Sequence, residues 1–169
     1  MNILAIDPSS TVAGFVLFQH DPVEARTLPV RAGVWDMTKC PSWEKYPKLI
    51  EFIQLTHEGK PLTQIACERA FMGRFNTAAL AVAVHCIEEW ARINRVPFTL
   101  YSPPQWKKGV IGKGTADKDT IREVLTRGNA WLADVLPSFR DNAQEHVVDA
   151  YGVGLHHIRQ LKSPGGENG

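Results

Sequence analysis

Two short apolar runs, far apart in the chain, each end in a carboxylate. Residues 1–6 (Met-Asn-Ile-Leu-Ala-Ile) lead into Asp7, and residues 63–67 (Thr-Gln-Ile-Ala-Cys) lead into Glu68. Runs of this length and composition are typical of buried strands. A carboxylate at the end of such a strand has lost water and needs a compensating cation. The two runs therefore predict two core strands that carry charged groups to the edge of the core.

The rest of the pattern predicts an α/β fold with a mixed sheet and helices on its faces. Besides strands over 2–7 and 63–68, we expect strands over 11–19, 30–35 and 97–101, and helices over 42–57, 76–94, 117–127 and 142–161. Three successive strands suggest an antiparallel meander, whereas the later alternation of helix and strand implies crossovers and parallel pairing. Pro103-Pro104 is expected to open a basic segment, and the stretch around Trp131 is expected to be a loop.

Length and composition bound the class of protein. We expect one domain over residues 1–161 and a disordered tail over 162–169, because 169 residues suit a single domain and the tail has no core residues. The formal net charge of +1 neither demands nor excludes a nucleic-acid partner. The irregularly spaced Cys40, Cys67 and Cys86 suggest reduced thiols and a cytoplasmic location rather than disulfides or a zinc site. With no basic leader and no apolar run of about 20 residues, we expect a soluble protein without a membrane partner.

Two further metal-binding side chains lie near the C-terminus. His146 and Asp149 are three residues apart on the last predicted helix, so both project from one face, and Glu145 lies nearby as a possible fifth member. If this face meets Asp7 and Glu68, the four groups could hold two ions about 4 Å apart, the arrangement of two-metal nucleases. Carboxylates suit Mg²⁺, and the imidazole shifts the site somewhat towards Mn²⁺. His146 could instead orient or deprotonate the attacking water.

Each of these residues also has an ordinary structural explanation. Asp7 precedes Pro8-Ser9 and could simply form a turn, and a glutamate after a strand is unremarkable. His156-His157 shows that histidines occur near this helix without a ligand pattern. Spacing alone therefore leaves two interpretations open. The four residues could form one metal site, or they could be unrelated caps and surface charges.

Two segments could contact nucleic acid. The stretch 105–127 has a net positive charge from Lys107, Lys108, Lys113, Lys118, Arg122 and Arg127 against Asp117, Asp119 and Glu123. Within it, 112–115 (Gly-Lys-Gly-Thr) forms a turn that leads to a helix N-terminus and suits phosphate contacts, although a solvated helix face is the alternative. After Glu68, the side chains of Arg69, Phe71 and Arg74 could stack on or wedge between bases. Phe71 and Phe75 could equally be core residues at helical spacing, and for Phe75 we favour the core position.

With these residues in view, the chain resembles the RuvC family of Holliday-junction resolvases, which share the RNase H-like fold. The matching stretches are 6–14, 68–72, 105–118 and 146–150, spread over nearly the whole chain in family order. The resemblance implies that the metal-binding catalytic set consists of Asp7, Glu68, His146 and Asp149. It also implies that Lys107 and Lys118 meet DNA phosphates near the cut and that Phe71 enters the junction centre. Two positions depart from the family: His146 stands where many members have aspartate, and Ser9 stands where glycine is common.

The resemblance implies a structure-selective endonuclease that makes paired, symmetric nicks in Holliday junctions or other branched DNA with Mg²⁺, or Mn²⁺ in its place. The divergent connecting segments suggest a phage or mobile-element version. Two symmetric nicks demand a homodimer, and the apolar stripe of the helix 76–94 could pair with its mate. The alternatives are a branched-DNA binding module that kept the fold without catalysis, and an actin-like phosphotransferase fragment, for which the chain is short.

Overall fold

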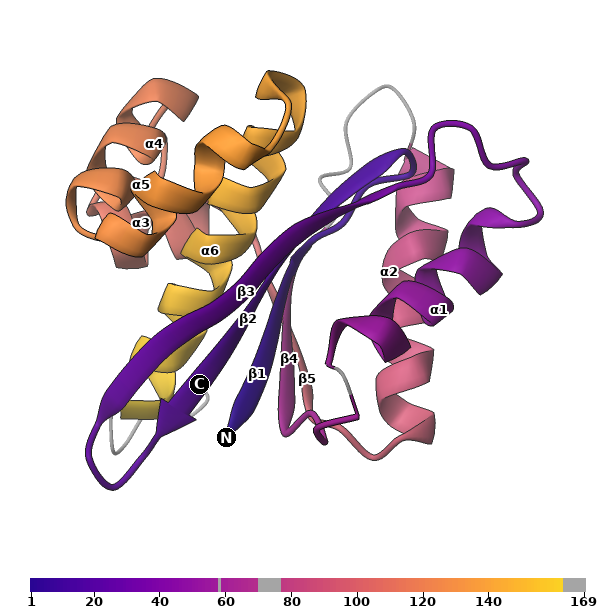
Figure 1. The fold of residues 1–169 in the computed structure, drawn as a ribbon, viewed down its shortest axis with the longest axis horizontal. Helices are drawn as coiled ribbons and strands as arrows, with labels where there is room; N and C mark the ends of the chain where they lie inside the picture. Colours follow the sequence, from indigo (N-terminus) through magenta and orange to yellow (C-terminus); the bar gives the residue numbers. More distant parts are fainter. Residues whose placement is uncertain (58, 70–76, 163–169) are drawn as a thin grey trace.

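The computed structural model describes residues 1–57, 59–69 and 77–162 (Figure 1). In chain order, the elements are β1 (Asn2–Asp7), β2 (Val12–Asp21), β3 (Arg26–Asp36), α1 (Lys45–Thr56), β4 (Gln64–Glu68), α2 (Thr77–Ile93), β5 (Phe98–Tyr101), α3 (Pro103–Ile111), α4 (Lys118–Arg127), α5 (Ala130–Val135), the 3-10 turn η1 (Leu136–Ser138) and α6 (Asp141–Lys162). None of the helices in these ranges is long and apolar enough to cross a membrane.

The strands form one mixed sheet in the order β3-β2-β1-β4-β5. The β1–β2 and β2–β3 pairs are antiparallel, whereas β1–β4 and β4–β5 are parallel. This confirms the predicted meander followed by crossovers. The parallel pairing places Ile6 opposite Cys67, so β1 and β4 end side by side at the same edge of the sheet.

Helices cover both faces of the sheet, with α3 to α6 on one side and α1 and α2 on the other (Figure 1). Successive residues of a strand point to opposite faces, and β1 follows this rule. Ile3 and Ala5 pack in the core beneath α6, while Leu4 and Ile6 pack in the core beneath α1 and α2. Asp7 continues the first series and therefore belongs to the α6 face.

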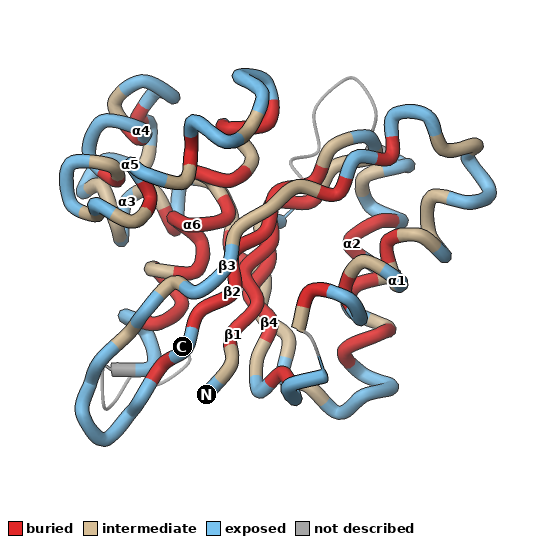
Figure 2. Tube along the Cα trace, in the orientation of Figure 1, coloured by how far each residue is buried: buried red, intermediate tan, exposed pale blue. Residues whose placement is uncertain are grey.

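The same alternation positions the end of β4. Ala66 belongs to the core on the α6 side, and Ile65 and Cys67 belong to the core on the α1–α2 side. Glu68 is two residues after Ala66 and so points to the α6 face as well. Both sheet faces are buried along β1 and β4, as Figure 2 shows by the red central strands.

Helix α6 lies directly against the sheet because glycines allow close approach. A Cβ atom added to Gly14 in β2 would stand 2.1 Å from the carbonyl oxygen of His146. Farther along, a Cβ on Gly154 of α6 would stand 2.3 Å from the Phe18 ring and 2.9 Å from Ala5. Contacts this short leave no room for a side chain. The helix therefore crosses β1 and β2 with its N-terminal half beside the end of β1.

Two helices occur where the sequence predicted none. The basic segment opened by Pro103-Pro104 begins with α3, because proline is accommodated in the first turn of a helix, where its missing N–H is not needed. The predicted loop around Trp131 contains α5, which Asn129 caps by accepting a hydrogen bond from the Leu132 N–H. Trp131 packs partly buried against the core on the α6 side.

Other boundaries shift modestly. β3 begins at Arg26 rather than at residue 30, since it pairs with the extended β2 along a long hairpin. Asp117 is the N-cap of α4, its carboxylate accepting from the Thr120 N–H at 2.8 Å. α6 continues to Lys162, one residue into the predicted tail, and the rest of that tail lies outside the described residues.

Candidate active site at the ends of β1 and β4

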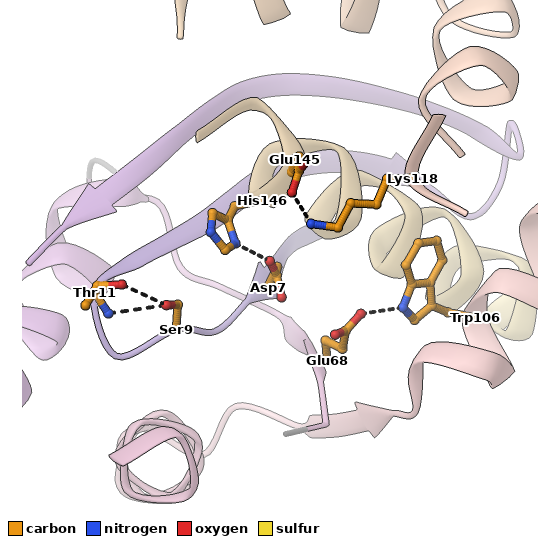
Figure 3. A network of polar contacts seen from close by, with 8 residues as sticks. All are labelled: Asp7, Ser9, Thr11, Glu68, Trp106, Lys118, Glu145 and His146. Atoms are coloured by element: carbon orange, nitrogen blue, oxygen red, sulfur yellow. Dashed lines mark hydrogen bonds and ion pairs between the residues drawn. The ribbon is translucent and has the colours of Figure 1, made fainter. Parts of the chain in front are cut away.

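Asp7 and His146 join the end of β1 to α6. The imidazole Nδ1 lies 2.6 Å from the Asp7 Oδ2 (Figure 3). An ionised carboxylate only accepts hydrogen bonds, so the imidazole Nδ1–H is the donor. This contact raises the pKa of His146 and leaves its Nε2 as the nitrogen that can bind a cation or exchange a proton. Asp7 is only 7% exposed, whereas the His146 side chain is 31% exposed, so the carboxylate end of this hydrogen bond is buried and the imidazole can still reach solvent.

Glu68 is held by a residue that sequence analysis did not single out. The indole Nε1–H of Trp106 in α3 donates to the Glu68 Oε2 at 2.6 Å (Figure 3). Trp106 is completely buried, and its ring packs where Gly152 of α6 leaves space. The tryptophan stands inside the stretch 105–118 that carries the family resemblance, but no spacing rule links it to Glu68.

The three carboxylates interact electrostatically, and their pKa values show it. Burial raises the pKa of Asp7, and burial together with the charge of Asp7 raises the pKa of Glu68 to about 8. The same two causes raise the pKa of Asp149 to about 7. Lys107 and Lys118 act in the opposite direction on Asp149 but do not compensate fully. The site therefore has a deficit of positive charge at neutral pH.

The chemistry of this donor set fits a divalent cation. Three carboxylates and one imidazole are ligands that Mg²⁺ and Mn²⁺ accept, and a cation would relieve the repulsion among the buried acids. Within the described residues, no group of three or more such side chains stands close enough together to coordinate one ion as they are. Asp7 and His146 are hydrogen-bonded to each other, so binding an ion requires side-chain rearrangement.

The two lysines that the resemblance implicates both lie at the site. Lys107 is near enough to Glu68 and Asp149 to lower their pKa values. The Lys118 ammonium donates to the Glu145 carboxylate, and the negative charges of Asp149 and Asp7 also contribute to its raised pKa. The possible fifth member of the metal site is thus paired with a lysine.

The remaining predicted nucleic-acid contacts are less closely tied to the acids. Arg69, Lys108 and Lys113 are exposed, the first directly after β4 and the others on α3 and the turn beyond it. Phe71 and Arg74, like the predicted core residue Phe75, lie outside the described residues. The N-terminus of α4, predicted to suit phosphate, is already capped by the Asp117 carboxylate.

Ser9, at a position where the family commonly has glycine, shapes the turn after β1. Its Oγ accepts a hydrogen bond from the Thr11 N–H at 3.2 Å and lies 3.4 Å from the Thr11 hydroxyl (Figure 3). The serine hydroxyl therefore satisfies a backbone group of the β1–β2 turn, two residues from Asp7.

A mixed sheet of this order, with acids at the ends of two adjacent parallel strands and on the helix that crosses them, defines an RNase H-like protein. The family model described as "Crossover junction endodeoxyribonuclease RuvC" matches residues 3–157. The chain belongs to the RuvC family, and membership implies dependence on a divalent metal.

Relatives in sequence and structure agree with this assignment. The chain is 25% identical over 173 residues to the crossover junction endodeoxyribonuclease RuvC of Wolinella succinogenes, with 98% of each chain covered. The RuvC of Helicobacter pylori strain 26695 is 25% identical over 166 residues, with 96% of this chain and 99% of that one covered.

Among solved structures, Thermus thermophilus RuvC superposes with a TM-score of 0.75 at 22% identity, covering 96% of each chain. The fowlpox virus Holliday junction resolvase superposes with a TM-score of 0.67 at 12% identity, covering 95% of this chain and 99% of that one. These likenesses show that the fold is shared.

Proposed function

We propose that this protein is an endonuclease that resolves Holliday junctions by nicking phosphodiester bonds at the site formed by Asp7, Glu68, His146 and Asp149. The observation that carries the proposal is the convergence of three carboxylates, one buried and two partly buried, and an imidazole from β1, β4 and α6, close enough to shift one another's pKa values. The relatives are named crossover junction endodeoxyribonucleases, and T. thermophilus RuvC in complex with a Holliday junction substrate has the same fold at a TM-score of 0.72.

Two Mg²⁺ ions, replaceable by Mn²⁺, are proposed as the cofactor, with the four side chains as ligands. When bound, such ions lower the pKa of water and stabilise the leaving oxygen. Other residues of the chain are proposed to bind the DNA. The ammonium groups of Lys107 and Lys118 are suited to hold the phosphate backbone beside the acids, and the Lys118–Glu145 pair would then open. Arg69, Phe71, Arg74, Lys108 and Lys113 are proposed to extend the DNA contact.

The role of His146 depends on which partner its Nε2 meets. Because Nδ1–H is bonded to Asp7, a neutral His146 has an unprotonated Nε2 that can either bind a cation or take a proton from the attacking water. Substitution by aspartate separates these roles. His146→Asp keeps a metal ligand, so retained nicking supports ligation, whereas loss of nicking with retained Mn²⁺ binding supports proton transfer.

Paired nicks require two active sites related by two-fold symmetry, and therefore a homodimer. The α1–α2 side of the molecule offers a surface for it. A groove of about 400 Å³ between these helices is lined by Tyr46, Pro47, Ile50, His85, Cys86, Glu89, Trp90 and Ile93. Ile93 in this lining is 65% exposed, and together with Ile50 and the other apolar lining residues it forms the kind of apolar patch that marks protein–protein contact sites.

A cytoplasmic location is also proposed, on the ground that Cys40, Cys67 and Cys86 all have free thiols.

The proposal is tested with a labelled synthetic four-way junction, incubated with and without Mg²⁺. We expect symmetric nicks that need the metal, and no nicks with Asp7→Asn, which should still bind the junction. A stable complex that the wild-type protein never cuts would favour the non-catalytic binding module. Loss of folding or of junction binding in Asp7→Asn would indicate a structural role for this carboxylate.

A further inference from the structure

The three most buried tryptophans of the described residues use their indole N–H groups differently. Trp35 donates to the Thr56 hydroxyl at 3.2 Å inside the core beneath α1 and α2. The Nε1 of Trp90 is buried with no hydrogen-bond partner among the described residues. Trp106 alone of the three donates to an acid of the proposed site, Glu68, at 2.6 Å. Since the fold tolerates an unpaired indole N–H at Trp90, packing alone does not require the contact of Trp106.

The Trp106 ring cannot move easily. The side chain is completely buried, and a Cβ atom on Gly152 would stand 2.4 Å from its Cζ3. Gly152 is three residues after Asp149 on α6, so the slot that receives the indole lies on the same face as that carboxylate. The donor of the hydrogen bond is therefore fixed by packing between α3 and α6 before any ligand binds.

Within the described residues, only one of the two carboxylate oxygens of Glu68 is hydrogen-bonded, so the other could bind a cation. The indole occupies Oε2, and Oε1 has no hydrogen-bond donor in the described part of the chain. An indole N–H only donates, so it favours Glu68 as an acceptor and holds one of its oxygens in a defined place. The Lys107 ammonium stands 5.7 Å from the Trp106 ring centroid.

We propose that Trp106 is a positioning residue of the metal site: its indole N–H holds Oε2 of Glu68 and so presents Oε1 to a divalent cation. This inference rests on the proposed function of Glu68 as a metal ligand. Removing a hydrogen-bond donor that orients a metal ligand typically lowers metal affinity or activity by roughly 10- to 100-fold.

The test compares Trp106→Phe with the matched control Trp35→Phe by calorimetric titration of the purified protein with Mn²⁺. Both substitutions remove an indole from the interior, but only the first removes a hydrogen bond to Glu68. We expect Trp106→Phe to raise the Mn²⁺ dissociation constant by roughly 10-fold or more and to lower the nicking rate, with junction affinity in EDTA unchanged. Trp35→Phe should bind Mn²⁺ as the wild type does.

A second experiment distinguishes positioning of Glu68 from a purely structural role of Trp106, by making the same substitution in a protein that lacks the Glu68 carboxylate. In a Glu68→Ala background, Trp106→Phe should leave the Mn²⁺ affinity unchanged, because the group that it positions is gone. An equal loss in both backgrounds, or wild-type affinity in Trp106→Phe itself, would overturn the proposal. A wild-type protein that binds no Mn²⁺ and nicks no junction would instead overturn the proposed function, and this inference with it.

A measurement on the wild-type protein decides the matter if Trp106→Phe does not fold. The Nε1–H resonances of Trp106 and Trp90 are followed by ¹H–¹⁵N NMR while Mg²⁺ is added. We expect the Trp106 resonance to shift at the concentration that saturates the site and the Trp90 resonance to stay in place. A Trp106 resonance that does not respond to Mg²⁺ rules the proposal out.

Discussion

At the scale of single residues, the site is built from acids that are poorly stabilised in the metal-free protein. Glu68 and Asp149 are partly buried near a third carboxylate, and their pKa values rise to about 8 and about 7. A group whose pKa is higher in the folded state stabilises the fold at low pH, and that contribution is lost as the pH rises through the folded pKa. The free energy of unfolding of the metal-free protein should therefore fall between about pH 4 and pH 8, as these two carboxyl groups ionise.

Glu68→Gln should accordingly raise the melting temperature of the metal-free protein at pH 8 and change it little at pH 4. The amide oxygen can still accept from the Trp106 indole, while the charge repelled by Asp7 is removed. Thermal unfolding in EDTA at both pH values measures the difference. Glu24→Gln, at an exposed carboxylate outside the site, is the control. A Glu68→Gln variant that is less stable than the wild type at pH 8 would contradict this reading of the site.

Not every contact at the residue scale is predictable from sequence. The ends of β1 and β4 identify Asp7 and Glu68, because a charged residue after an apolar run is visible in the chain itself. The hydrogen bond from Trp106 is not visible, since it joins α3 to the end of β4 across 38 positions of the chain and depends on α3 packing against α6. The pairing of Lys118 with Glu145 is hidden for the same reason.

At the scale of elements, the fit of α6 against β2 determines whether the site forms. Periodicity predicted α6 and the five strands, because each buries one or both faces along its length. It missed α3 and α5, since two prolines and a short capped turn resemble a connection. The close approach of α6 depends on Gly14, whose lack of a side chain admits the backbone of His146.

Gly14→Ala should therefore destabilise the protein and disrupt nicking together. The added methyl would stand 2.1 Å from the His146 carbonyl oxygen, which is backbone and cannot turn aside. We expect a loss of about 1–3 kcal/mol or more in the free energy of unfolding, measured by urea denaturation. Gly128→Ala is the control, because its Cβ would meet its nearest neighbour, the Val124 carbonyl oxygen, at 3.4 Å. Equal stability of the two variants would show that α6 has freedom to move.

At the scale of the whole molecule, the two faces of the sheet are proposed to serve different functions. The α6 face gathers the acids, and the α1–α2 face carries the apolar groove proposed to meet a second copy. The sequence predicted the stripe on α2, but the groove also needs Tyr46 and Ile50 from α1, which only the fold brings beside it.

Ile93→Glu should shift the protein from dimer to monomer, because it places a charge at the rim of the groove. Analytical ultracentrifugation measures the change, and Val23→Glu, at a 92% exposed position on the β2–β3 turn, serves as the control. The monomer should nick junctions slowly and without pairing. A variant that stays dimeric would place the interface on another surface.

Asp7, Glu68, His146 and Asp149 are proposed to gather around divalent cations. Anomalous diffraction from crystals grown with Mn²⁺ would locate such ions. We expect two anomalous peaks roughly 4 Å apart in contact with carboxylate oxygens of Asp7 and Glu68. Crystals of protein that is active with Mn²⁺ but has its anomalous peaks elsewhere would contradict this proposal.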